Sequence, residues 1–374
     1  MAGLYIHIPF CTDKCFYCDF YSGNQLYLID DYVDSVVKEI KLRSNYLVGN
    51  KVNTIYFGGG TPSLLSSRQI AKILNEVYLN FEVNNYPEIT MEFNPENISK
   101  DYLLQLNNLG VNRISLGVQF LDDNLLFKFN RKHSKQIIFN ALDYISVSKF
   151  KNLSIDLIYS VPGLTDEILL SSLIQLMKFD IKHISAYNLT IAKNSKLYWK
   201  ILKGEFLESK EDTFISQYNI INEYLKSMGY NQYEVSNYAK EDFYSLHNFS
   251  YWSQVDYLGV GVSAHSYNKV SRQWNLNNIK KYIKDLEVGL LNYEFEELTE
   301  NQAYNEYIIL NLRTFQGLSM KYIKSNFNEN IYNHFLKNIN ILKERGSFIF
   351  RNDLIIPNDC DLLIADFLAK ELIY

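Results

Sequence analysis

The chain has 374 residues, of which 47% are hydrophobic and 21% are charged, and its formal net charge at neutral pH is -5. This length exceeds what one hydrophobic core usually organises, so we expect a large domain with a smaller one, and the composition excludes an intrinsically disordered chain. The negative charge, without a cluster of Lys and Arg, excludes a broad nucleic-acid surface, and no stretch stays apolar long enough to span a bilayer.

The first predicted element is a strand over residues 3–9, which leads directly into a group of cysteines. No basic leader precedes this strand, so we expect a cytosolic protein without a transmembrane segment, for which a peripheral contact with a membrane stays open. Thiols are kept reduced in the cytosol, where clustered cysteines indicate metal binding or redox chemistry more often than disulfides.

Three cysteines, Cys11, Cys15 and Cys18, follow the first strand within eight residues. Thiolates at this spacing are suited to a cuboidal iron–sulfur cluster, which is a soft-ligand site. Because three cysteines are one short of full ligation, one iron would stay open to an outside ligand. Zinc is the alternative metal, but it requires a fourth protein ligand, for which His7 and Asp13 are the nearest candidates.

Five further stretches rich in Ile, Val, Tyr and Phe are predicted as strands, and amphipathic helices alternate with them. The strands are expected at residues 53–58, 88–93, 112–118, 153–159 and 182–189, and the helices at 29–44, 66–80, 99–109, 134–147 and 166–178. This alternation indicates right-handed βαβ units and a parallel sheet. Six units predict an α/β protein with a partial (β/α)6 barrel similar to a TIM barrel.

Glycine and polar motifs come where the predicted strands end. A run of glycines leads to Thr61 after the second strand, Glu92 ends the third, Gln119 closes the fourth and Asp156 lies inside the fifth. Parallel barrels gather their active residues at the C-terminal ends of their strands, so we expect these side chains near the cysteines. A plain turn would explain the glycines equally well, and a solvated strand end would explain Glu92. A buried Asp156 would require a ligand or an arginine partner.

Beyond residue 189 the alternation ends, and a long helix is predicted near residues 208–228. From about residue 297 helices dominate and reach the sequence Ser347-Phe348-Ile349-Phe350, which suits a hairpin. We therefore divide the chain into a barrel (residues 1–205), a segment that completes the barrel (206–296) and a small, mainly helical C-terminal accessory domain (297–374). Cys360, alone in an apolar stretch, is predicted to be a core residue.

Taken together, these motifs resemble the radical S-adenosylmethionine (SAM) superfamily, and within it the branch of oxygen-independent coproporphyrinogen III oxidases and HemW-type heme chaperones. The resemblance rests on the cysteine spacing, the preceding Tyr-Ile-His-Ile-Pro-Phe, the glycine run and the ordered polar residues. It implies a 4Fe-4S cluster on the three cysteines, whose open iron binds the methionine end of SAM. The residues that it implies for SAM binding are Tyr5, Tyr17, Gly59, Gly60, Thr61, Glu92, Gln119, Arg131 and Asp156.

Two features favour the chaperones over the oxidases. The oxidases typically carry a further cysteine two residues beyond the third, where this chain has Asp19-Phe20, and they have a longer segment before the cluster loop. The sequence His-Asn-Phe-Ser-Tyr-Trp at residues 247–252 matches the signature of HemW-type proteins. The resemblance implies that His247 ligates heme iron while Tyr251 and Trp252 cover the porphyrin. His265 is the competing ligand, and a buried His247 satisfied by the backbone is the alternative interpretation.

The resemblance thus implies a heme chaperone that binds heme and transfers it to acceptor proteins such as respiratory-chain hemoproteins. Its SAM-coordinated cluster would receive electrons from a donor such as flavodoxin or ferredoxin. The alternative function is that of an enzyme, the oxidative decarboxylation of coproporphyrinogen III to protoporphyrinogen IX by radical SAM chemistry. A third hypothesis is a zinc-binding interaction module without redox chemistry. The chaperone hypothesis assigns no catalytic residue.

Overall fold

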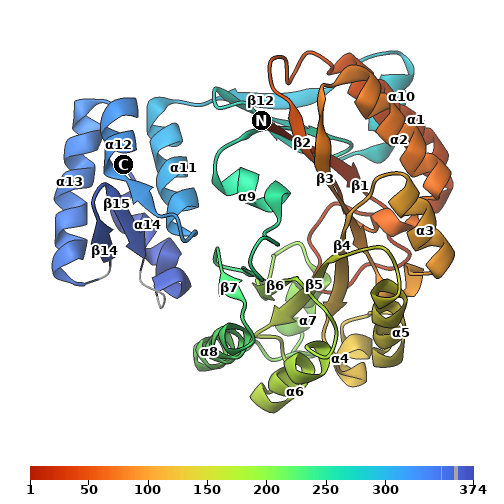
Figure 1. Cartoon of the computed structure of the whole chain (residues 1–374), viewed down its shortest axis with the longest axis horizontal. Helices are drawn as coiled ribbons and strands as arrows, with labels where there is room; N and C mark the ends of the chain where they lie inside the picture. The colour runs from red at the N-terminus through yellow and green to blue at the C-terminus, as the bar shows by residue number, and fades with distance from the viewer. Residues whose placement is uncertain (347, 358–360) are drawn as a thin grey trace.

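The computed structural model describes residues 1–346, 348–357 and 361–374. Figure 1 shows a large lobe that contains a curved sheet with helices around it, and a smaller lobe formed by the C-terminal residues. Each lobe has its own cluster of buried hydrophobic side chains. The two clusters agree with the expected large domain and smaller domain. The boundaries of the three predicted segments stay a prediction.

Six strands run parallel and lie side by side in chain order, as the sequence predicts. They are β1 (Ala2–Ile8), β2 (Val52–Gly59), β3 (Val83–Phe93), β4 (Arg113–Gln119), β5 (Asn152–Tyr159) and β6 (His183–Asn188). Most of their residues are buried. Helices cover one face of the curved sheet, and the other face encloses its interior. The predicted partial barrel is thereby confirmed.

Helices cover the outer face of this sheet (Figure 1). The five predicted helices are α1 (Ile29–Leu42), α2 (Ser67–Asn80), α3 (Lys100–Asn108), α5 (Lys135–Ser146) and α6 (Asp166–Leu176). Side-chain N-caps set the starts of α2, α3, α5 and α6, and Ser66 with Gln69 forms a full capping box on α2. Two further helices, α4 (Asp123–Lys128) and α7 (Lys196–Leu202), were not predicted, because they are too short to show a helical period. Short 3-10 turns lie at Leu26–Leu28, Pro62–Leu64, Pro95–Asn97 and Asp361–Ile364.

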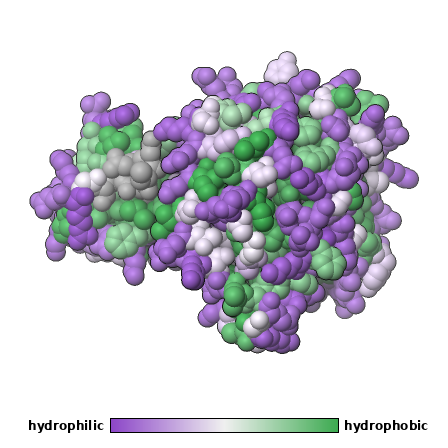
Figure 2. Space-filling view, turned by 90° about the horizontal axis from the view of Figure 1, so that it is seen from below, coloured by the Kyte–Doolittle hydropathy of each residue, from purple (hydrophilic) through white to green (hydrophobic). Residues whose placement is uncertain are grey.

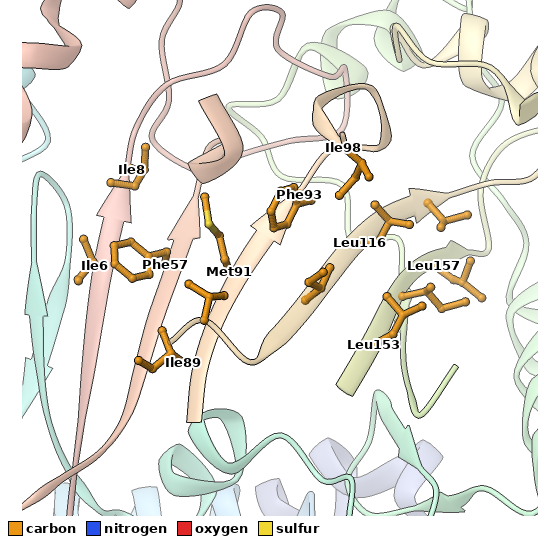
Figure 3. Close-up of a cluster of buried hydrophobic side chains, with 14 of the residues drawn as sticks. Ile6, Ile8, Phe57, Ile89, Met91, Phe93, Ile98, Leu116, Leu153 and Leu157 are labelled. Atoms are coloured by element: carbon orange, nitrogen blue, oxygen red, sulfur yellow. The ribbon is translucent and has the colours of Figure 1, made fainter. Parts of the chain in front are cut away.

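Alternation along the strands separates two sets of side chains. Figure 3 shows part of the apolar set, with Ile6, Phe57, Met91 and Leu116 among its members. These side chains belong to a buried cluster that also contains residues of α1, α2, α3, α5 and α6. The residues between them, such as Tyr5, face the interior of the curved sheet, because successive side chains of a strand point to opposite faces. The interior is therefore lined by the polar and aromatic members of the same strands.

Further strands extend both edges of the sheet, which the sequence analysis did not predict. On one side β9 (Asp256–Val260) pairs parallel with β1, followed by the antiparallel strands β10 (His265–Tyr267), β11 (Ser271–Asn275) and β12 (Tyr293–Glu297). On the other side β8 (Asn237–Ala239) pairs antiparallel with β6, and β7 (Asn231–Gln232) follows. In the described part of the chain no pairing joins β12 to β7, so the twelve-stranded sheet curves without closing.

Three helices accompany these outer strands, namely α8 (Glu211–Ser227), α9 (Leu246–Trp252) and α10 (Ile279–Glu287). The long helix predicted near residues 208–228 is confirmed as α8. Helix α9 contacts β1 and β2, and its first backbone N–H groups, those of Leu246 and His247, donate to the Glu88 carboxylate on β3. Since Glu88 comes early in the paired part of β3, α9 lies toward the N-terminal ends of the barrel strands.

The smaller lobe is mainly helical, as predicted. It consists of α11 (Glu300–Leu312), α12 (Met320–Asn326), α13 (Glu329–Glu344) and α14 (Ala365–Leu372) around an antiparallel sheet of β13 (Leu318–Ser319), β15 (Leu354–Pro357) and β14 (Phe348–Arg351). Strands β14 and β15 form the hairpin that the sequence suggests. Ser347 and Cys360 lie outside the described residues, so the predicted core role of Cys360 stays a prediction.

The surface gives no sign of a continuous apolar band on the face shown in Figure 2, where hydrophobic patches alternate with hydrophilic ones. Among the described residues, no helix combines the length and the hydropathy that crossing a bilayer requires.

A buried ion pair ties α1 to the outer strands. The Glu39 carboxylate accepts hydrogen bonds from Arg43 Nε (2.9 Å), Asn275 Nδ2 (2.7 Å), the Gly261 N–H (2.9 Å) and the Tyr282 hydroxyl. Glu39 is 1% exposed, so the carboxylate depends on these donors in place of water. The contacts fix the strands β9 to β11 against the helical layer.

We expect the substitution Glu39→Ala to lower the free energy of unfolding by about 3–5 kcal/mol, because it leaves the buried Arg43 without its charged partner. The matched control is Lys51→Ala, which removes an exposed pair with Glu82 (2.6 Å) and should cost about 0–1 kcal/mol. Urea unfolding of the two variants measures the difference, and equal costs would contradict a structural role for the Glu39 network.

Candidate functional site

The three cysteines of the loop after β1 are free thiols, and each is partly exposed. The Thr61 hydroxyl donates to Cys11 Sγ (3.5 Å), and Arg131 Nη1 donates to Cys15 Sγ (3.3 Å). The loop therefore contacts the segment after β2 and the segment that precedes α5. Two residues carried over from the family resemblance, Thr61 and Arg131, thus lie directly beside two of the cysteines.

The thiols of the loop raise one another's pKa values. Burial, with the neighbouring Cys15, raises the pKa of Cys11, and burial, with the neighbouring Cys15 and Cys11, raises the pKa of Cys18 to about 11. Without a metal these two thiols keep their protons at neutral pH, whereas a bound metal ion deprotonates a coordinating thiol outright. The donor set is therefore one that iron would convert to thiolates.

The described residues do not assemble a site for a single metal ion, since no group of three or more His, Cys, Asp and Glu side chains in them is close enough to hold one. Both candidates for a fourth zinc ligand have other partners. His7 contacts the Tyr5 hydroxyl (3.2 Å) and the Tyr21 carbonyl (3.0 Å), and Asp13 pairs with Lys132 (3.6 Å). A cuboidal cluster fits better, because each of its irons takes one thiolate and the sulfurs need not converge on one atom.

Arg131 connects the cysteine loop to the barrel. Besides Cys15, its guanidinium donates from Nη2 to the Asn94 side-chain oxygen (3.1 Å) and to the Gly117 carbonyl (2.9 Å). Asn94 also donates to the Thr61 hydroxyl (3.3 Å), so it joins the two residues that contact the cysteines. Sequence reasoning missed Asn94, although its place two residues after Glu92, at the end of a predicted strand, was a usable signal.

The glycine run is required by the packing of the protein itself. Gly59 has a φ of +110°, and a Cβ there would lie 2.5 Å from the His7 ring. A Cβ on Gly60 would lie 2.7 Å from the Phe10 carbonyl oxygen. Both positions thus exclude larger residues without any ligand, which agrees with the plain-turn interpretation, and a contact of these glycines with SAM stays a prediction.

Glu92 is held inside the curved sheet and is not a freely solvated strand end. Its carboxylate accepts from the Tyr56 hydroxyl (2.9 Å) and from the Gly59 N–H (3.1 Å). Burial, with the neighbouring Asp156, raises the pKa of Glu92 to about 7. Asp156 accepts from the Ser115 hydroxyl (3.1 and 3.2 Å), and the ligand expected at Asp156 stays a prediction.

The remaining residues predicted for SAM binding lie around these groups. The ring of Tyr5 stacks on Tyr56 at 6.0 Å, in the same interior as Glu92. Gln119 ends β4 with a φ of +64°, a strained conformation for a residue with a side chain. The hydroxyl of Tyr17 is buried and has no hydrogen-bond partner among the described residues. An unsatisfied hydroxyl and a strained strand end at one edge of the barrel are typical of a ligand site.

A cavity of about 1070 Å³ opens beside these residues, between the β1–β9 side and the β6–β8 side of the curved sheet. Aromatic side chains form a large part of its wall, including Tyr5, Tyr187, Tyr251, Trp252 and Tyr257, beside polar and charged ones. The small lobe contributes residues from the end of α11 and from α14. The volume lies slightly above the range of about 300–1,000 Å³ that is usual for small-molecule sites, so the cavity has room for a large ligand.

His247, predicted as a heme ligand, does not line this cavity. It is 1% exposed, and its ring contacts the Thr54 hydroxyl through Nδ1 (2.8 Å) and the Tyr251 hydroxyl through Nε2 (2.8 Å). Burial and the nearby Arg113 lower its pKa to about 3. Both ring nitrogens are therefore engaged, which agrees with the alternative of a satisfied buried histidine, although side chains rather than the backbone satisfy it.

The other residues of the predicted heme site do reach the cavity. Tyr251 and Trp252 line it from α9, and His265 lines it from β10 with an exposed side chain. Burial and the nearby Arg272 lower the pKa of His265, so its ring is neutral at neutral pH.

Comparison with known proteins identifies relatives of this chain. A family model described as the radical SAM superfamily matches residues 5–173. The heme chaperone HemW of Bacillus subtilis is 31% identical over 92% of this chain and 92% of its own length, and that of Lactococcus lactis is 32% identical over 86% and 84%. Coproporphyrinogen III oxidase (HemN) from Escherichia coli, a radical SAM enzyme, superimposes with a TM-score of 0.87 at 24% identity, covering 100% of this chain and 90% of the enzyme. This last likeness shows the fold alone.

We expect Glu92→Gln to change how stability depends on pH. The pKa of Glu92 rises from 4.5 to about 7 on folding, so the folded protein holds a proton that the unfolded chain releases between these values. The stability that this proton contributes is complete below pH 4.5 and is lost as the pH rises toward 7. Gln cannot titrate, so the variant should gain about 2–3 kcal/mol relative to the wild type between about pH 5 and pH 8.

Chemical unfolding of the protein without cluster or SAM measures this difference, because bound cations would shift the titration of Glu92. The exposed Glu287→Gln serves as the matched control and should follow the wild-type profile. Parallel profiles for wild type and Glu92→Gln would contradict the raised pKa.

Proposed function

The chain belongs to the HemW family of radical SAM proteins, and on that premise we propose that it binds heme and transfers it to acceptor proteins, with a SAM-coordinated 4Fe-4S cluster. The observation that carries the proposal is the similarity, over nearly the whole chain, to relatives named heme chaperones. The proposal includes a cytoplasmic location, acceptors such as respiratory-chain hemoproteins, and reduction of the cluster by a flavodoxin or a ferredoxin.

Cys11, Cys15 and Cys18 would hold the cluster. When bound, it supplies an open iron to SAM and an electron for SAM cleavage. The residues around the cysteines suit this group: Thr61 donates to one sulfur, and the Arg131 cation donates to another. Hydrogen bonds and positive charge beside the sulfurs stabilise the more negative, reduced state and thereby raise the reduction potential.

The interior of the barrel would hold SAM. SAM carries an ammonium group, a sulfonium group and ribose hydroxyls, and the carboxyl groups of Glu92 and Asp156 offer acceptors for such donors in a partly buried place. The other residues proposed for this site are Tyr5, Tyr17, Gly59, Gly60, Thr61, Gln119 and Arg131. Their position between the cysteine loop and the polar interior supports the proposal.

Heme is the cargo in this proposal, and the cavity is its proposed site. The wall offers aromatic rings to the porphyrin faces, among them Tyr251 and Trp252. Residues of the barrel and of the small lobe both line the cavity, so heme would lie between these two parts of the chain. The residues after Cys18 line the cavity as well, which brings the two proposed sites next to each other.

One feature of the sequence separates this function from that of the oxidases. Phe20 stands where the oxidases typically carry a further cysteine, and its side chain is 61% exposed at the cavity. The fold likeness to the oxidase does not decide between the two functions, because one fold supports several chemistries.

The test uses the reduced, reconstituted protein. We expect it to bind ferric heme with one-to-one stoichiometry and to leave coproporphyrinogen III unchanged in the presence of SAM. Heme absorbance and product chromatography measure the two outcomes. Formation of protoporphyrinogen IX would overturn the proposal in favour of the oxidase, and absence of heme binding would overturn it outright.

We expect Cys15→Ala to abolish bound iron and sulfide, because two thiolates do not hold the cluster, while heme binding persists. Cys15 does not line the cavity, so heme affinity should change by no more than about threefold, or about 0.7 kcal/mol. Iron and sulfide analysis, with heme titration on the same sample, measures both. Full iron content in the variant would count against the cluster site.

A further inference from the structure

The histidines of the chain differ in how their ring nitrogens are used. His7, His183 and His247 engage both nitrogens in contacts with neighbouring groups. His133 is buried against Glu96, and His334 lies on the small lobe, away from the cavity. Because heme iron needs a free ring nitrogen, His7, His183 and His247 are not poised to ligate it, and His133 and His334 do not line the cavity.

His265 is the exception among the described residues. It lines the cavity, its side chain is exposed, and neither of its ring nitrogens makes a hydrogen bond to the described part of the protein. The ring stacks on Trp274 of β11, with centroids 6.0 Å apart and planes at 25°. The imidazole is therefore oriented by an aromatic contact that leaves its nitrogens free.

The backbone around His265 is fixed by a close approach of two strands. A Cβ on Gly259 would lie 2.1 Å from the His265 carbonyl oxygen, so only glycine allows β9 and β10 to come this near. The Ser266 hydroxyl contacts the Gly259 N–H (3.0 Å) and strengthens the junction. This explains the glycine-rich sequence before His265 and gives the residue a rigid support.

The guanidinium of Arg272 lies on the same face of the sheet as His265. Arg272 of β11 pairs with Tyr267 of β10, and its guanidinium lies 4.9 Å above the Tyr267 ring. His265 and Arg272 are diagonal neighbours across the two strands, at a separation of about 7–8 Å. Glu306 holds Arg272 through Nε (2.6 Å), while Arg272 still lines the cavity.

We propose that this face of β10 and β11 recognises heme, with His265 as the iron ligand and Arg272 as the partner of a heme propionate. The inference rests on the proposed function and names its ligand residues. A neutral imidazole is the usual protein ligand of heme iron, and guanidinium is the cation best matched to a carboxylate. The other aromatic side chains of the cavity would then enclose the porphyrin.

Ferric heme titrated into the full-length protein tests the ligand, followed by absorbance and by electron paramagnetic resonance. We expect His265→Ala to lose the spectrum of imidazole-ligated heme and to bind heme at least about tenfold more weakly. Added imidazole should restore the ligand spectrum, which a merely structural role would not allow. The matched control is His334→Ala, which should bind heme as the wild type does.

The outcomes separate the inference from the function. If the wild type binds no heme, the proposed function fails. If the wild type binds heme and His265→Ala keeps its affinity and spectrum, the function survives and His265 is not the ligand. Loss of the ligand spectrum in His247→Gln but not in His265→Ala would likewise overturn the assignment.

A second titration compares heme with its dimethyl ester, whose propionates carry no charge. We expect the wild type to prefer the free acid by about tenfold. The double variant Arg272→Gln with Glu306→Gln, which leaves no carboxylate unpaired, should lose this preference and keep the ligand spectrum. An unchanged preference would overturn the role of Arg272.

Discussion

The alternation of side chains along the parallel strands governs the structure, because each strand is buried on both faces. One face must be apolar, since helices α1 to α6 pack on it, as the side chains of Figure 3 illustrate. Polar residues are consequently confined to the other face, which encloses the barrel interior. Glu92 and Asp156 therefore lie near each other inside the barrel although 63 residues separate them, and burial, with the neighbouring Asp156, raises the pKa of Glu92.

The glycines show how packing and function can demand the same residue. Gly59 and Gly60 are fixed by their contacts with His7 and the Phe10 backbone, which hold β1 and the cysteine loop against the end of β2. Thr61 follows directly and contacts Cys11. The geometry of the cysteine loop thus depends on tight strand packing, and a ligand at this place would use a backbone that the fold has already positioned.

The sequence predicted the barrel well, because long apolar strands and amphipathic helices show clear periods. It missed β7 to β12 and α9, whose two to seven residues are too short for a period and include many polar positions. The same shortness explains the case of His247: the motif identifies the family, but residue spacing within a short helix does not reveal that the His247 ring is enclosed between Thr54 and Tyr251, while Tyr251 and Trp252 also line the cavity. Contacts such as Arg131 with Cys15, across 116 residues, have no local signal at all.

Several of the missed elements, among them α9 and β9 to β11, line the cavity together with the predicted strands β1 and β6, and their character fits a cargo site. Short strands at the edge of a sheet and loops have fewer stabilising contacts than the central parallel strands, so the wall that carries His265 would depend on added supports. Glu39 provides one by binding the Gly261 N–H and Asn275 from α1, and the close contact of Gly259 with His265 provides another. A rigid wall facing an open side of the barrel allows heme to be held firmly on one face and to remain accessible on the other, which release to an acceptor requires.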